Sequence, residues 1–136
     1  MNFETDEIKM LGVYDPGVPN LERVVLRVQR DVALSSYCII TAVKADIGGG
    51  HIPMNDHFLW LGNSKLQQGD WIFVYTGPGS AQQNPLPETP HKLLSLYWGK
   101  PTTIFPDGTT LVPGLISVET ARFPSGFRAL QIDHNL

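Results

Sequence analysis

The chain has 136 residues, of which 42% are hydrophobic and 17% are charged. That length is typical of one domain, with enough apolar side chains for a core and too few charges for an intrinsically disordered chain. Ten Lys and Arg against thirteen Asp and Glu give a formal net charge of -3. This excludes a global basic field that would attract nucleic acid or an anionic membrane. We expect a single domain over 1–136, with residues 1–6 as candidates for disorder.

The cysteine content and the N-terminal residues favour a cytoplasmic location. Cys38 is the only cysteine, so an internal disulfide and a zinc site of several thiolates are excluded. Residues 1–10 carry Glu4, Asp6 and Glu7 where a secretory signal would carry basic residues and then an apolar run. The longest apolar stretches are far shorter than the roughly 20 residues of a membrane-spanning helix. We expect a soluble protein without a membrane segment.

Strand signals dominate the first part of the chain. Thirteen glycines and eleven prolines leave no long uninterrupted helical pattern. In 22–30, Val24, Leu26 and Val28 alternate with polar residues, which predicts a half-buried strand. The nearly charge-free run 37–43 predicts a strand that is central in a sheet or buried on both faces.

The middle of the chain alternates between predicted strands and loops. Gly48-Gly49-Gly50 ends the preceding strand, because three successive glycines cost too much backbone entropy in a regular element. We expect a mobile loop from there to about Asn55. Residues 57–61 and 70–76 predict strands joined by turn residues. The stretch 77–91 holds four prolines and has no period, so it predicts a long Pro-rich loop.

Short strands also fill the last part of the chain. Residues 92–98 predict a strand, and 102–105 and 110–112 predict a hairpin closed by Pro106-Asp107-Gly108-Thr109. Two further strands are predicted at 115–123 and 127–132. Seven to ten short strands with turn signals about every ten residues predict an all-β fold, an antiparallel β-sandwich or a barrel.

Three runs of sequence carry a family resemblance: Glu22 to Leu26, Asp31 to Ile40, and Leu66 to Gly77. Leu96-Tyr97-Trp98 and the run from Ile104 to Gly108 match a later Trp-bearing segment and a final Asp-Gly turn. Over about residues 7 to 120 the chain resembles the lamin-tail domain, an immunoglobulin-like β-sandwich. It departs from that pattern at Val28-Gln29-Arg30, where an Asn is usual, and at Pro106. The resemblance implies a non-catalytic module that binds proteins, nucleic acid or other ligands, and it transfers no catalytic residue.

One group of residues could hold a divalent metal ion. His51, Asp56 and His57 lie within seven residues, and imidazole with carboxylate is a ligand set for zinc. The strict spacing of helical metalloenzymes is absent, and the three residues are also explained as surface and turn residues. The alternative is a metal-assisted hydrolase at these residues. No other cofactor is indicated.

Other reactive or charged groups have simpler interpretations. Cys38 lies in an apolar run, where a free cysteine behaves as a small hydrophobe. No Gly-x-Ser-x-Gly elbow is present. Arg23, Arg27, Arg30 and Lys44 could share the outer side of two early strands, but without interleaved aromatic residues we interpret them as a solvated surface. Nucleic acid is therefore not an expected partner.

The preferred function is a non-catalytic protein-interaction or scaffolding module that contacts partners through loops 47–56 and 77–91. Binding residues are expected beside the second loop, at Tyr75, Pro78, Gln82, Gln83 and Trp98. Edge strands could pair two copies, which makes a protein partner or a homo-oligomer the expected assembly. A carbohydrate- or lipid-binding sandwich that uses exposed Trp side chains is a further alternative.

Overall fold

The computed structural model describes residues 7–45 and 48–126, and their regular structure is almost entirely β. They contain ten strands and one short 3-10 helix: β1 (Ile8–Tyr14), β2 (Arg23–Val28), β3 (Val32–Ala33), η1 (Leu34–Ser36), β4 (Tyr37–Lys44), β5 (His51–Trp60), β6 (Lys65–Leu66), β7 (Trp71–Tyr75), β8 (Gln82–Pro85), β9 (Lys92–Tyr97) and β10 (Leu111–Ser117). No helix among them is long and apolar enough to cross a bilayer. The all-β prediction is confirmed. The expected disorder of 1–6 and the strand at 127–132 lie outside the described residues.

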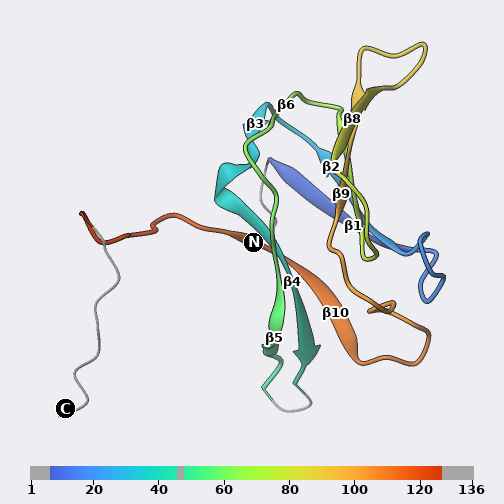
Figure 1. The fold of residues 1–136 in the computed structure, drawn as a ribbon, viewed down its shortest axis with the longest axis vertical. Coiled ribbons are helices and arrows are strands. Elements are labelled where there is room, and N and C mark those ends of the chain that lie inside the picture. The colour runs from blue at the N-terminus through green and yellow to red at the C-terminus, as the bar shows by residue number, and fades with distance from the viewer. Residues whose placement is uncertain (1–6, 46–47, 127–136) are drawn as a thin grey trace.

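The largest sheet has five strands in the order β1-β2-β7-β9-β8 (Figure 1). Its neighbours are antiparallel except for β7 and β9, which run parallel. The chain passes from β7 to the far edge as β8, and β9 then returns into the gap between them. β9 pairs antiparallel with β8 on one side and parallel with β7 on the other. The expectation of a purely antiparallel sandwich is therefore wrong for β7 and β9.

A second sheet has three strands in the order β10-β4-β5, and β3 pairs with β6 in a small ribbon. β4 is central, which confirms the prediction from its charge-free sequence. β5 begins at His51, so the loop predicted up to Asn55 is wrong over 51–55. The apolar alternation that would have revealed this strand is absent, because β5 is an edge strand and residues 51–56 are all exposed.

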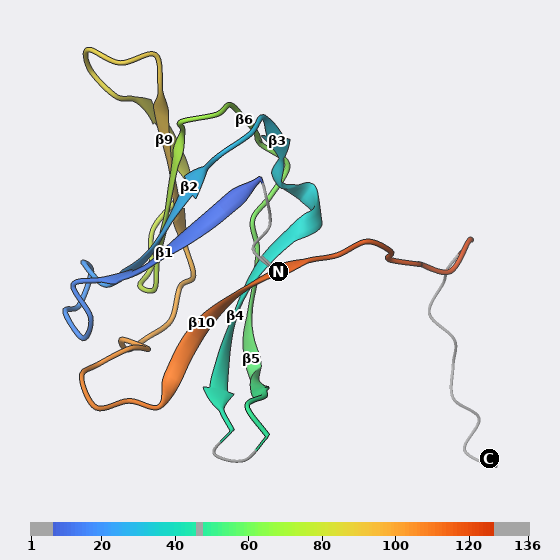
Figure 2. The ribbon, with the colours of Figure 1, turned by 180° about the vertical axis from the view of Figure 1, so that it is seen from behind.

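The two larger sheets share one core through their inner faces. Val24, Leu26 and Val28 of β2 are at most 1% exposed, which confirms the predicted alternation. They pack with Ile72 and Val74 of β7, and with Ile39 of β4 from the other sheet. Figure 2 shows β1, β2 and β9 on one side of the molecule, and β4, β5 and β10 lower down on the other.

Three predictions after residue 76 need correction. The stretch 77–91 is not wholly a loop, because Gln82–Pro85 pair with β9 as an edge strand. Residues 102–105 form no strand, because the backbone amides of Ile104 and Phe105 bind the Glu22 carboxylate instead of a neighbouring strand. The turn at 106–109 does form, with Gly108 at φ +85°, but the strand after it pairs with β4.

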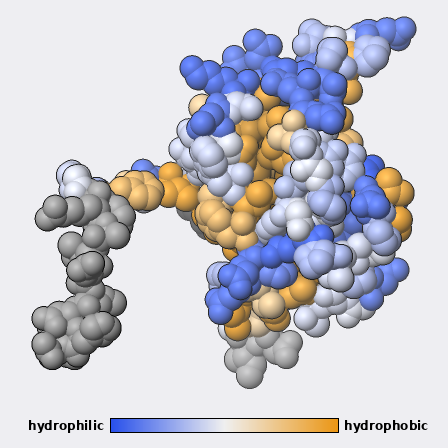
Figure 3. Space-filling model, in the orientation of Figure 1, coloured by the Kyte–Doolittle hydropathy of each residue, from blue (hydrophilic) through white to orange (hydrophobic). Residues whose placement is uncertain are grey.

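The predicted strand at 115–123 is also only partly right. β10 runs through Ser117, and the last backbone hydrogen bond of this region joins Val118 N–H to the carbonyl of Ser36. Residues 118–126 then extend away from the sheets, and hydrophobic side chains are exposed along this segment (Figure 3). Phe123 is 85% exposed.

Candidate functional site

The outer face of the five-stranded sheet gathers aromatic and basic side chains. Side chains alternate across a strand, so the register aligns outward residues of neighbouring strands in rows. One row is Lys9, Arg27, Trp71, Leu93 and Asn84, the next is Val25, Phe73, Ser95 and Gln82, and the third is Tyr14, Arg23, Tyr75 and Tyr97. We call this surface the arginine–aromatic face.

The two arginines of this face lie against aromatic rings. The Arg27 guanidinium carbon is 4.3 Å from the centre of the Trp71 ring. That of Arg23 lies 5.1 Å from the Phe73 ring and also contacts Tyr14 and Tyr75. Cation–π contacts of this kind contribute about 0.5–1 kcal/mol each at exposed sites. They favour positions of the two guanidinium groups close to these rings.

The third row is extended by ring stacking. The rings of Tyr75 and Tyr97 lie 5.1 Å apart with an interplanar angle of 12°. Tyr14, at the β1 end of the row, is 48% exposed. The row therefore presents a rigid aromatic surface whose outer end is accessible.

The arginines retain unused hydrogen-bonding capacity. Arg23 is held by Asp15 through a 2.7 Å ion pair, whereas Arg27 forms no ion pair within residues 7–45 and 48–126. The Nε atoms of both arginines are buried and lack a hydrogen-bond partner in that part of the chain. A buried donor without an acceptor costs free energy, and a ligand could reach these two Nε atoms only if the side chains around them moved.

A shallow apolar cavity of about 370 Å³ opens on the same face. It is lined by Tyr14, Arg23, Val25, Trp71, Phe73, Leu86 and Leu93. Hydrophobic walls with one cationic group are typical of a recognition pocket that takes an apolar anchor and orients it through a polar contact.

The prediction that no aromatic residues share a face with Arg23 and Arg27 is wrong. The alternation of Trp71, Phe73 and Tyr75 is visible in the sequence, but only the pairing of β2 with β7 places these rings beside the arginines. Lys44 belongs to the other sheet, where it pairs with His51. The expected basic cluster is therefore divided between the two sheets.

The binding residues expected beside the second loop do not form one surface. Tyr75 and Gln82 lie in rows of the arginine–aromatic face, whereas Gln83 is paired with Leu94 and alternates to the opposite side. Pro78 lines a separate cavity of about 260 Å³ beside Asn20 and Lys100. Trp98 packs against the core and makes an edge contact with the His57 ring, with centroids 6.3 Å apart.

The predicted metal residues lie along β5. His51 is at its start, and Asp56 adopts φ +62° where the pairing with β4 shifts register. The carbonyl oxygen of Asp56 accepts a hydrogen bond from Lys100. Burial and, next, the positive charge of Lys100 lower the pKa of the His57 imidazole, against the opposing effect of Asp56. In the described part of the chain, no three His, Cys, Asp or Glu side chains are grouped closely enough to hold a metal ion.

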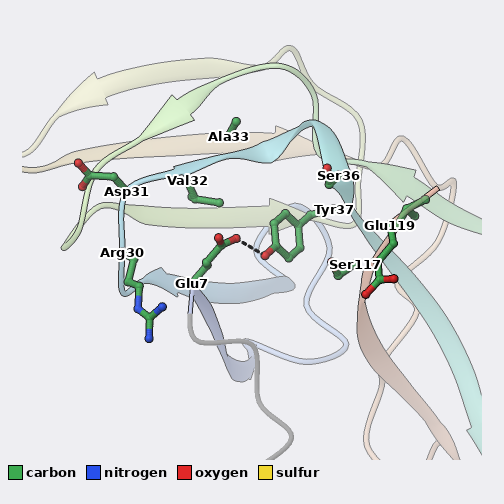
Figure 4. A pocket seen from close by; sticks show the side chains of 10 residues that line it. Glu7, Arg30, Asp31, Val32, Ala33, Ser36, Tyr37, Ser117 and Glu119 are labelled. Atoms are coloured by element: carbon green, nitrogen blue, oxygen red, sulfur yellow. Dashed lines mark hydrogen bonds between the residues drawn. The ribbon is translucent and has the colours of Figure 1, made fainter. Parts of the chain in front are cut away.

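A polar cavity of about 650 Å³ lies between the start of β1 and the end of β10 (Figure 4). Glu7 and Tyr37 point toward each other there, and the Tyr37 hydroxyl donates a hydrogen bond to the carboxylate. Asp31, on its rim, accepts a hydrogen bond from the Gln68 amide. These carboxylates already have structural partners.

Cys38 offers little nucleophilic character. The side chain is buried, and burial raises the pKa of its thiol. The thiolate, which is the reactive form, is thereby disfavoured.

The arginine–aromatic face therefore has the composition of a recognition site. Among the described residues, no group of side chains is arranged for a particular reaction. No family model matches the chain, and comparisons with curated proteins and with solved structures give no match either.

Proposed function

We propose that the chain is a non-catalytic interaction module that binds a segment of a partner protein on the arginine–aromatic face. The supporting observation is the Arg27 guanidinium, which lies over Trp71 without a carboxylate partner, beside an apolar cavity of about 370 Å³. Arginine and aromatic residues are enriched at protein interfaces and among the residues that dominate binding energy.

The chemistry of the face defines the kind of segment. The rows that make up the face contain Lys9, Arg23 and Arg27 but no Asp or Glu, and Asp15 beside them neutralises only Arg23. An acidic side chain of the partner would pair with Arg27. An aromatic or large aliphatic side chain next to it would fill the cavity. The exposed amides of Gln82 and Asn84 at the β8 edge would bond the partner's backbone.

The experiment is a selection of random displayed peptides on the full chain. We expect the bound peptides to share an acidic residue next to a large apolar one. Arg27→Gln and Tyr14→Ala should each weaken a selected peptide about tenfold, since about 1.4 kcal/mol of lost contact corresponds to that factor. Arg122→Gln changes an exposed arginine outside the face and should leave affinity unchanged. Peptides that bind all four proteins equally would refute the proposal.

A second candidate is single-stranded nucleic acid, because basic residues interleave with aromatic rings on this face. Such proteins combine a basic groove with rings on which bases stack. Fluorescence polarisation of labelled oligonucleotides at two salt concentrations would separate the candidates. Affinity that falls steeply with salt and depends on Arg27 would assign the face to nucleic acid.

The lamin-tail relationship and the immunoglobulin-like assignment also remain proposals. They are supported by the short, mostly antiparallel strands, and the parallel pairing of β7 with β9 departs from a purely antiparallel sandwich. The alternative of a carbohydrate- or lipid-binding sandwich would depend on Trp60, which is 48% exposed on the other sheet.

A further inference from the structure

Residues 118–126, which we call the exposed segment, extend from the end of β10 into solvent. Beyond the hydrogen bond from the Val118 amide to the carbonyl of Ser36, no backbone hydrogen bond joins residues 119–126 to the rest of the described chain. Residues 119–126 are all exposed, and the exposed fraction of Phe123 is 85%. The segment therefore keeps its backbone groups and an aromatic ring available to another molecule.

The exposed segment contains a carboxylate and an aromatic ring, the two groups that the arginine–aromatic face is suited to bind. Glu119, its only acidic residue, lies at the rim of the polar cavity (Figure 4) and forms no ion pair within residues 7–45 and 48–126. Phe123 is its only aromatic residue. On the face, Arg27 also lacks an ion-pair partner in that part of the chain, and an apolar cavity of about 370 Å³ lies nearby. The segment and the face are therefore complementary in charge and in polarity.

The spacing of the two groups in the segment also matches the face. In an extended chain, residues four apart lie on the same side and about 13 Å from each other, at roughly 3.3 Å per residue. Glu119 and Phe123 are four residues apart, and so are Arg27 and Arg23 along β2. Arg23 lines the apolar cavity. Ala121, between the two groups, is small enough to let the segment approach the sheet.

Within one copy, the exposed segment and the arginine–aromatic face point away from each other. Figures 1 and 2 both show the segment directed away from the five-stranded sheet. The arginine–aromatic face is the outer face of that sheet, since its inner face packs on the core that it shares with the three-stranded sheet. A segment that reaches this face must therefore come from a second copy.

We propose that the exposed segment of one copy binds the arginine–aromatic face of a second copy, with the Glu119 carboxylate on the Arg27 guanidinium and the Phe123 ring in the apolar cavity. This inference rests on the proposed function and names the partner as another molecule of this chain. The contact is heterologous, because each copy contributes one segment and one face. Arg122 alternates to the other side of an extended segment, so its positive charge points away from the face. One such contact is smaller than a stable interface, so the copies should separate on dilution.

Analytical ultracentrifugation of the full chain over a range of concentrations tests the inference. We expect the mass of the wild type to rise above 15.1 kDa as concentration increases. Glu119→Arg and Arg27→Glu should each raise the dissociation constant about tenfold or more, because each places like charges together. An equimolar mixture of these two variants should associate again, because each segment then meets a face of opposite charge on the other variant. Phe123→Ser should weaken association as well, whereas Arg122→Gln, in the same segment, is the matched control and should associate like the wild type.

The inference is overturned by a wild type that stays at 15.1 kDa at every concentration, by a Glu119→Arg or Phe123→Ser variant that associates like the wild type, or by a mixture no stronger than either variant alone. Both segment variants lie outside the sheets, so they test the contact without changing the core. If Arg27→Glu does not fold, Arg27→Gln takes its place in the comparison with the wild type. Displayed peptides contain no part of this chain. Peptides that need Arg27, together with a monomeric wild type, would therefore refute this inference and keep the proposed function.

Discussion

Glu22 is the side chain on which three distant segments converge. It is 1% exposed, and its oxygens accept four hydrogen bonds: from Gly17 N–H at 2.7 Å, Thr76 hydroxyl at 2.8 Å, Ile104 N–H at 2.6 Å and Phe105 N–H at 3.0 Å. A buried carboxylate is tolerated only when its lone pairs are satisfied in this way. Glu22 thereby fixes the loop before β2 and the segment before β10 to the end of β7.

Substituting Glu22 should destabilise the fold without removing a charge pair. In Glu22→Gln, an amide NH2 replaces one acceptor oxygen and faces donors, so bonds to a charged acceptor are lost. We expect the free energy of unfolding to fall by about 2–3 kcal/mol. Urea unfolding measures this, with the exposed Glu119→Gln as control, for which a change below about 0.5 kcal/mol is expected. Equal effects of the two substitutions would contradict the role assigned to Glu22.

Asp70 connects the turn before β7 to β9. It is fully buried, and it accepts hydrogen bonds from the Gln67 amide and from both the amide and the side chain of Lys92, the last at 2.8 Å. Burial alone would raise the pKa of Asp70, but these hydrogen bonds outweigh it and the pKa lies below its usual value. The sequence predicts a turn-forming residue at Asp70. Only the tertiary structure shows that Asp70 pairs with Lys92.

The lowered pKa of Asp70 fixes the sign of a pH effect. The folded state holds the carboxylate charged, so its contribution is complete above the unfolded pKa of about 3.9. It is lost as pH falls through the lower folded pKa. We expect the unfolding free energy of the wild type to fall more steeply below about pH 4 than that of Asp70→Asn. Parallel curves from urea titrations across this range would disprove the assignment.

At the scale of elements, tight turns set the register of the five-stranded sheet. The turn before β7 ends at Gly69, which has φ +94° and donates its N–H to the carbonyl of Val28 at 2.8 Å. The position of a β-carbon on Gly69 is already occupied by the His91 ring. This turn therefore needs glycine for its backbone conformation and for the close approach of the segment before β9.

A double-substitution series separates these two requirements. Gly69→Ala should cost about 1–2 kcal/mol from the positive φ, and more from the collision with His91. Adding His91→Ala should recover the second part only, so the double variant stays less stable than His91→Ala alone. Thermal unfolding of the four proteins gives the coupling. Strictly additive effects would show that the ring moves aside without cost.

For the whole molecule, the two larger sheets turn their inner faces to a common core and present two chemically different outer faces. The arginine–aromatic face is polar at its β8 edge and cationic at Arg27, whereas the outer face of the three-stranded sheet is apolar around Phe58 and Trp60 and carries Lys44 and His51 at one end. The proposed binding site for a partner segment therefore lies on a different sheet from Phe58 and Trp60.

Much of the local structure could be read from the sequence. The alternation in 22–30, the charge-free run that became β4, and the turn at 106–109 needed only local periodicity and turn chemistry. The sequence predicts the second half of β5, at 57–61, but not its first half or β8, because residues 51–56 and 82–85 are exposed and lack an apolar period. The sequence predicts a strand at 102–105, because nothing local indicates that the Ile104 amide binds a carboxylate 82 residues away.

The amino-acid sequence by itself determined the all-β class, the single cysteine, the charge balance and the best strands, because these depend on composition and on neighbours along the chain. Which side chains lie together on one surface depends on the tertiary structure alone. Arg27 meets Trp71, and Ile40 meets Phe58, only through the pairing of strands that are distant in sequence. Strand order and register arise from the packing of the whole core, and a shift of one residue would turn each outer face inward.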